Sequence, residues 1–106
     1  RQTLTSFRPL AVYPAAPRDL ALIVGDAVPV GRIVAEIREV AGEMAESVNV
    51  FDVYRGKPIP AGLKSVGITI VYRSLERSLS GDEVEQIQQK VAARLKTSLN
   101  AELREQ

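Results

Sequence analysis

Alternating apolar and polar positions along the chain predict three strands. A short apolar run at 19–24 ends at Gly25-Asp26, as expected of a buried strand followed by a turn. Residues 48–55 and 66–72 are rich in β-branched and aromatic side chains, and the second run alternates between large and small residues. The glycines and prolines between these two runs predict a hairpin loop at 56–64, longer than a tight two-residue turn.

Helical spacing of apolar residues predicts two amphipathic helices. The first is expected at 29–41, with Pro29 in its first turn and Gly42 as the residue that ends it. The second has the clearest start in the chain, because Ser80 and Glu83 have the spacing of a capping box. Its apolar stripe consists of Val84, Ile87, Val91, Leu95 and Leu99. A short last strand at 101–104 would complete the series.

The order strand, helix, strand, strand, helix and strand is the split βαβ arrangement of an α+β fold, called ferredoxin-like. We therefore expect a βαββαβ sandwich in which both helices pack on one face of an antiparallel sheet and the other face stays open. A chain of 106 residues forms one domain. We expect a lead-in segment at 1–17 and the domain at 18–106. The abrupt opening suggests a piece cut from a longer protein.

Strand alternation assigns residues to the two faces of the predicted sheet. The set expected toward the helices is Leu20, Leu22, Val24, Val48, Val50, Val66, Ile68 and Ile70. The set expected on the open face is Asp19, Ala21, Asn49, Phe51, Val53, Arg55, Ser65, Gly67, Thr69 and Arg73. An aromatic with small neighbours and peripheral arginines suits base stacking and phosphate contact. Packing of Phe51 under the N-terminal segment is the alternative interpretation.

Composition narrows the possible chemistry. The chain has no cysteine and no histidine, which excludes disulfides, sulfur-based zinc sites and imidazole relays. A catalytic role is disfavoured, although carboxylates, Lys, Tyr and Ser remain. No apolar run approaches the ~20 residues that span a bilayer, and the N-terminus lacks the design of a signal peptide. We expect a cytoplasmic protein without membrane contact.

Charge is unevenly distributed although the net charge is only +1. Positions 55–77 hold five basic residues and one acid, whereas positions 32–46 hold four acids and two arginines. One region can therefore present a positive surface to phosphates. The alternative interpretation is that these charges are scattered at random over a solvated surface, which would give the same counts. Asp19 and Asp52 lie in otherwise apolar strands, where a charge needs a partner; an arginine or an RNA base is the candidate.

Four blocks of sequence carry a resemblance to a known family. They are Tyr13-Pro14 with 18–21, then 51–56, then Lys64-Ser65, and 77–80 with 82–84. In this order and spacing, over roughly positions 8–104, the chain resembles the ferredoxin-fold anticodon-binding domain that closes the β subunit of bacterial phenylalanine–tRNA ligases. Position 78 is a serine where the family often has threonine.

The resemblance implies a non-catalytic domain that contacts the anticodon stem-loop of phenylalanine tRNA. Its parent would be a cytoplasmic ligase of two α and two β subunits, which uses ATP and magnesium on the α subunit. No cofactor, metal or catalytic residue is then expected in this segment. By face and chemistry, the candidate RNA-binding residues are Arg18, Asp19, Phe51, Asp52, Arg55 and Arg73.

Three other functions compete with anticodon binding. A docking module would hold the β subunit together without touching RNA. A small-ligand regulatory domain would pair its sheets edge to edge in a homodimer. An acylphosphatase-like enzyme is disfavoured, because the loop at 25–28 has no arginine-bearing phosphate cradle.

Overall fold

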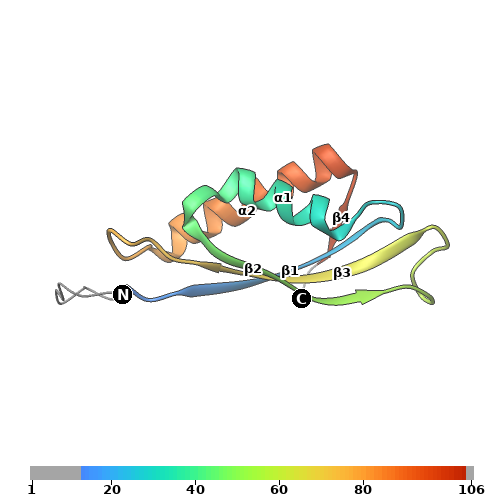
Figure 1. Cartoon of the computed structure of the whole chain (residues 1–106), viewed down its shortest axis with the longest axis horizontal. Helices are drawn as coiled ribbons and strands as arrows, with labels where there is room; N and C mark the ends of the chain where they lie inside the picture. The colour runs from blue at the N-terminus through green and yellow to red at the C-terminus, as the bar shows by residue number, and fades with distance from the viewer. Residues whose placement is uncertain (1–12, 105–106) are drawn as a thin grey trace, which may run out of the picture.

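The chain forms a four-stranded antiparallel sheet of order β2-β3-β1-β4. The computed structural model describes residues 13–104. The elements are β1 (Ala16–Gly25), α1 (Val30–Ala41), a 3₁₀ turn η1 (Gly42–Met44), β2 (Ala45–Tyr54), β3 (Leu63–Tyr72), α2 (Gly81–Leu99) and β4 (Glu102–Arg104). Both helices lie on one side of the sheet, and no described element covers the other side (Figure 1). The predicted ferredoxin-like α+β fold is confirmed.

The strands begin earlier than the sequence predicted. β1 starts at Ala16, inside the segment expected as a lead-in, and β2 and β3 start at Ala45 and Leu63. The ladder explains these extensions, since Tyr72 at the end of β3 pairs with both Ala16 and Ala45. Hydrogen bonding to a central strand overrides the weak strand propensity of the residues at the ends. The rest of the expected lead-in, residues 1–12, lies outside the described residues.

The hydrophobic core lies between the sheet and the helices. Its most buried large side chains are Leu20, Leu22, Val24, Ile33, Ile37, Val66, Ile68, Ile70, Tyr72, Val84, Val91 and Leu95. Val48 and Val50 of β2 are partly buried and pack against them. The strand residues predicted to face the helices therefore do so. Each large apolar side chain that is fully buried contributes roughly 1.5–3 kcal/mol, so this layer supplies the main driving force for folding.

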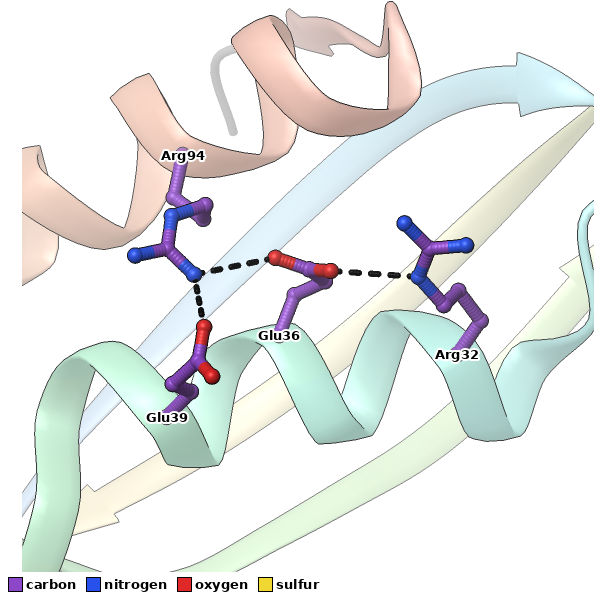
Figure 2. A network of polar contacts seen from close by, with 4 residues as sticks. All are labelled: Arg32, Glu36, Glu39 and Arg94. Carbon is purple, nitrogen blue, oxygen red and sulfur yellow. Dashed lines mark hydrogen bonds and ion pairs between the residues drawn. The ribbon is translucent and has the colours of Figure 1, made fainter.

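A charged network links the outer surfaces of the two helices (Figure 2). Arg94 of α2 reaches Glu36 and Glu39 of α1, and the other carboxylate oxygen of Glu36 lies 3.1 Å from Arg32 Nε. Hydrogen bonds from Arg94, which has the larger effect, and from Arg32 hold the pKa of the Glu36 carboxyl below its ordinary value. Both acids of α1 contact Arg94 Nη1, so the network ties α2 to α1 by charged hydrogen bonds.

Local signals fix both ends of α2. Ser80 Oγ accepts a hydrogen bond from the Glu83 backbone N–H, and the Glu83 carboxylate accepts one from the Ser80 backbone N–H. Arg77 donates to the same carboxylate, and these contacts lower the pKa of Glu83 to about 2. Asn100 ends the helix in the left-handed conformation. The predicted capping box is therefore confirmed, and it sets where the loop after β3 becomes helix.

A buried polar link joins α2 to the sheet. The Tyr72 side chain is fully buried, and its hydroxyl donates to Gln88 Oε1 at 2.5 Å. Gln88 Nε2 donates in turn to the Asp19 carbonyl of β1 at 3.3 Å. Burial raises the pKa of Tyr72 to about 12. The link satisfies a hydroxyl that would otherwise be costly inside the core.

We expect Ser80→Ala to lower the free energy of unfolding by about 1 kcal/mol, because the helix loses a partner for an unsatisfied backbone N–H. Urea denaturation measures the change. Ser78→Ala is the matched control, since this exposed serine lies in the same loop outside the capping box. Equal unfolding free energies for the two variants would contradict a role for the cap.

We expect Tyr72→Phe to cost about 1 kcal/mol, since it keeps the ring and removes one hydrogen bond. The folded pKa of about 12 lies above the ordinary value of 10.0. This tyrosine therefore stabilises the fold fully below pH 10 and loses that contribution as the pH rises through 12. Denaturation across this window should show the wild type losing more stability than the variant. Parallel pH curves would show that Tyr72 does not titrate as described.

Candidate nucleic-acid interface

Small residues form the floor of the open sheet face. The register places Asp52, Gly67, Ala21 and Arg104 in one row across all four strands. The next row consists of Tyr54, Ser65, Ile23 and Glu102. Directly paired residues of antiparallel strands share a face. The centre is therefore shallow, with aromatic side chains at the β2 edge and charged ones at the β4 edge.

Phe51 lies against this floor at a β-bulge. The register of β2 against β3 shifts between Val50 and Asp52, which makes Phe51 an extra residue in its strand. A Cβ atom placed on Gly67 would lie 2.8 Å from two carbons of the Phe51 ring. The missing side chain thus gives the ring its place, while 58% of Phe51 remains exposed. A glycine inside a strand often marks such a close approach.

The bulge corrects one prediction about β2 and brings to the open face an aromatic residue that the sequence had not assigned. Val53, expected on the open face, pairs with the buried Val66 on the helix side, although its edge position leaves it 39% exposed. Tyr54 takes the open-face position opposite Ser65 and is 45% exposed. Strict alternation cannot foresee an inserted residue. The signal that pointed to Tyr54 was the glycine in the partner strand, which is typical of a bulge.

The hairpin after β2 holds the Tyr54 ring in place. The Tyr54 hydroxyl donates to the Lys57 carbonyl at 2.6 Å. Gly56 has a φ of 111°, a conformation that other residues rarely adopt. A Cβ on Gly56 would also meet the tyrosine oxygen at 3.4 Å. Tyr54 therefore presents a fixed, half-exposed ring beside Phe51.

The two candidate acids lie on this face, in neighbouring rows. Asp19 is paired in register with Thr69 and accepts a hydrogen bond from its hydroxyl at 2.7 Å. Asp52 is exposed and pairs with Gly67. The partner of Asp19 is thus a threonine rather than the arginine considered from the sequence. A carboxylate has lone pairs for several donors, so Asp19 keeps acceptor capacity for a ligand.

Arg55, expected on the open face, lies at the hairpin end of the sheet, one residue beyond the last paired position of β2. Its Nε lies 2.6 Å from Asp26 Oδ1, and both side chains are about half exposed. The contact engages Nε, and an arginine has further N–H donors on its Nη atoms that can bind a phosphate. Arg55 is the candidate arginine that directly follows Tyr54 in the chain.

The other two candidate arginines lie elsewhere. Arg18 pairs with the buried Ile70, so it belongs to the helix side of the sheet, and it donates to the Pro17 carbonyl at 2.8 Å. Arg73 follows β3 at the opposite end from the hairpin. Its Nη1 donates to the Tyr13 carbonyl at 2.6 Å, and its Nε lies 2.8 Å from a Glu46 carboxylate oxygen without hydrogen-bond alignment. Arg73 ties residues before β1 to the sheet.

Two features are not found in residues 13–104. Within this range, no group of three or more His, Cys, Asp or Glu residues is placed to hold a metal ion. No described helix combines the length and apolar character needed to cross a bilayer.

A family comparison agrees with this geometry. The model of the ferredoxin-fold anticodon binding domain matches residues 11–104, which is nearly the whole chain. The chain belongs to this anticodon-binding domain family. Its sequence blocks divide between two roles in the fold: Leu20 and Val84 are buried, whereas Phe51 and Asp52 lie on the open face.

Curated relatives of this anticodon-binding domain are phenylalanine–tRNA ligase β subunits. The subunit of Synechococcus sp. (strain JA-2-3B'a(2-13)) is 40% identical over 104 residues, which cover 98% of the chain and 13% of that subunit. The subunit of Clostridium tetani is 44% identical over 98 residues, covering 92% and 12%. That of Coxiella burnetii is 40% identical over 102 residues, covering 95% and 13%. The chain spans about an eighth of the length of these relatives.

Among solved structures, a PII-like signaling protein of Thermus thermophilus is 16% identical to the anticodon-binding domain. The match covers 85% of this chain and 84% of that protein with a TM-score of 0.44. A likeness of this strength carries no argument about function.

We expect Gly67→Ala to displace the Phe51 ring from the sheet. The new Cβ would clash with the ring, and an exposed side chain swings away more easily than a ladder shifts. Nuclear Overhauser contacts between the ring and the Hα at position 67 should disappear. The free energy of unfolding should change by no more than about 1 kcal/mol, since alanine suits a strand better than glycine.

Gly31→Ala in α1 is the matched control, because its Cβ would meet nothing within 4 Å. It should leave the contacts of Phe51 unchanged. A Gly67→Ala protein in which the ring still rests on residue 67 would show that the glycine is not needed for the platform.

Proposed function

We propose that this domain binds the anticodon stem-loop of phenylalanine tRNA on its open sheet face, as part of a phenylalanine–tRNA ligase β subunit. The observation that carries the proposal is the Phe51 ring, seated on Gly67 and 58% exposed in a face that no described element covers. A core aromatic would be buried by the helices. An aromatic side chain exposed on a sheet face is suited to stack on an unpaired base.

The surrounding residues supply the other contacts of single-strand recognition. Phe51 and Tyr54 offer two stacking surfaces, and stacking of one base contributes about 1–3 kcal/mol. Asp52 and Asp19 accept hydrogen bonds from N–H groups on base edges. Arg55 at the hairpin end binds a phosphate as a charged donor. Arg18 and Arg73, which already bind within the protein, act at most as peripheral phosphate contacts.

The parent enzyme proposed from the family is a cytoplasmic ligase of two α and two β subunits. It would activate phenylalanine with ATP and magnesium on the α subunit and transfer it to tRNA. In that assembly this domain holds the far end of the tRNA and supplies no catalytic group or cofactor site. Contacts made elsewhere in the enzyme hold the tRNA close to this domain. They raise the effective concentration of the anticodon and so strengthen its binding here.

A docking role without RNA contact is the second candidate, and one observation favours it. Arg55 and Arg73 are both paired with acids of the same domain, as structural ion pairs would be. A docking module would tolerate loss of the exposed aromatic without any change in RNA binding. The two functions therefore differ in the response to substitution of Phe51.

We expect Phe51→Ala to weaken binding of the phenylalanine anticodon stem-loop by the contribution of one stacked base, about 1–3 kcal/mol. Affinity of the domain alone should fall in the ~10⁻⁴ to 10⁻⁶ M range of electrostatic binding, so NMR titration of labelled protein is the suitable measurement. In the wild type, shifts should cluster at Phe51, Asp52 and Arg55 and exceed those caused by a scrambled loop.

Leu75→Ala is the control for loss of an exposed apolar side chain, since Leu75 is 87% exposed in the loop after β3. This variant should bind the stem-loop as the wild type does. Equal binding by Phe51→Ala and the wild type would reject the stacking surface. Absence of any shift on the sheet would favour the docking module.

A further inference from the structure

The turn between β1 and α1 is fastened to the β2–β3 hairpin through the backbone of Asp26. The Asp26 N–H donates to the Gly62 carbonyl at 2.9 Å. The Asp26 carbonyl accepts from Lys64 Nζ at 3.0 Å, and Lys64 is only 4% exposed. A buried ammonium needs such a partner. The position of Asp26 relative to the hairpin is therefore fixed without its carboxylate.

The Asp26 carboxylate contacts Arg55, the residue directly after the aromatic pair. Arg55 Nε donates to Asp26 Oδ1 at 2.6 Å. Arginine has five N–H donors, and among the described residues this contact engages Nε. The contact joins segments that lie 29 positions apart in the sequence. A long side chain that would otherwise sample many rotamers is thereby anchored to a backbone that is itself held in place.

We propose that Asp26 is a positioning residue that holds the Arg55 guanidinium at the hairpin end of the sheet, ready for a phosphate of the bound RNA. This inference rests on the proposed function. Only the side-chain carboxylate is involved, because Lys64 and Gly62 bind backbone atoms of Asp26. An exposed ion pair contributes only about 0–1 kcal/mol to the stability of a fold. Stabilisation of the fold therefore does not explain this pair.

The test compares Asp26→Asn with Glu43→Gln in the full chain. Both variants remove one negative charge and keep the side-chain shape. Glu43 is an exposed residue of η1, which precedes β2 at the opposite end of the sheet from the hairpin. The change in net charge is therefore the same in both. Because an acid is lost, affinity for a scrambled loop should rise slightly and to a similar extent in each variant.

Two measurements distinguish the positioning of Arg55 from the general effect of removing a negative charge. In the free protein, the Arg55 Nε–H should exchange with water faster in Asp26→Asn than in the wild type and in Glu43→Gln. With RNA, base contacts hold the cognate loop alone in one register, so only its phosphate meets Arg55 at a fixed position. The ratio of cognate to scrambled affinity should therefore fall about two- to five-fold in Asp26→Asn, the range expected of one exposed ion pair. Glu43→Gln should keep the wild-type ratio. In an Arg55→Gln background, Asp26→Asn should cause no further fall.

Equal Arg55 exchange in the wild type and Asp26→Asn would overturn the inference whatever the RNA result. So would an equal affinity ratio in Asp26→Asn and Glu43→Gln. A wild-type domain that does not distinguish the two loops would reject the proposed function, and the inference with it. The exchange measurement would then still report whether Asp26 fixes Arg55, so the two failures can be told apart.

Discussion

The pairing of β3 along both of its edges is the constraint on which the rest of the structure depends. β1 and β2 both pair with it in antiparallel register. Its alternate residues Val66, Ile68, Ile70 and Tyr72 are fully buried beneath the helices, and the residues between them form the floor of the open face. Since strand side chains alternate with period two, one register sets both surfaces. A slip of one residue would place the core side chains in solvent and the floor under the helices.

The features that sequence predicted well depend on residues close together in the chain. The capping box at Ser80 and the end of α1 at Gly42 are local, and both occur where expected. The alternation of β1 and β3 also survives, because the central ladder contains no inserted residue. The strand ends were misjudged because pairing with a distant strand, rather than local propensity, decides how far a ladder continues.

The parts of the candidate site that sequence missed depend on contacts between distant segments. Phe51 takes its place because a glycine in another strand leaves room for the ring. The hydroxyl that binds Asp19 comes from Thr69, fifty positions away. Charge counts indicated a basic region around the hairpin but not the acid that holds Arg55. The residue types alone suggested stacking and phosphate contact. Which of these side chains lie together depends on the strand register and on the bulge, which the residue types do not specify.

The bulge at Phe51 also helps to decide whether the open face or an edge strand of the sheet is the binding surface. A regulatory homodimer of this fold would pair sheets edge to edge. β2 forms one edge of the sheet, and its register breaks between Ala45 and Ser47 and again between Val50 and Asp52. Such irregularities, together with exposed acids such as Glu46 and Asp52, disfavour addition of another strand. The same inserted residue brings Tyr54 to the open face. One local distortion therefore weakens the edge as a docking surface and equips the face to bind an unpaired base.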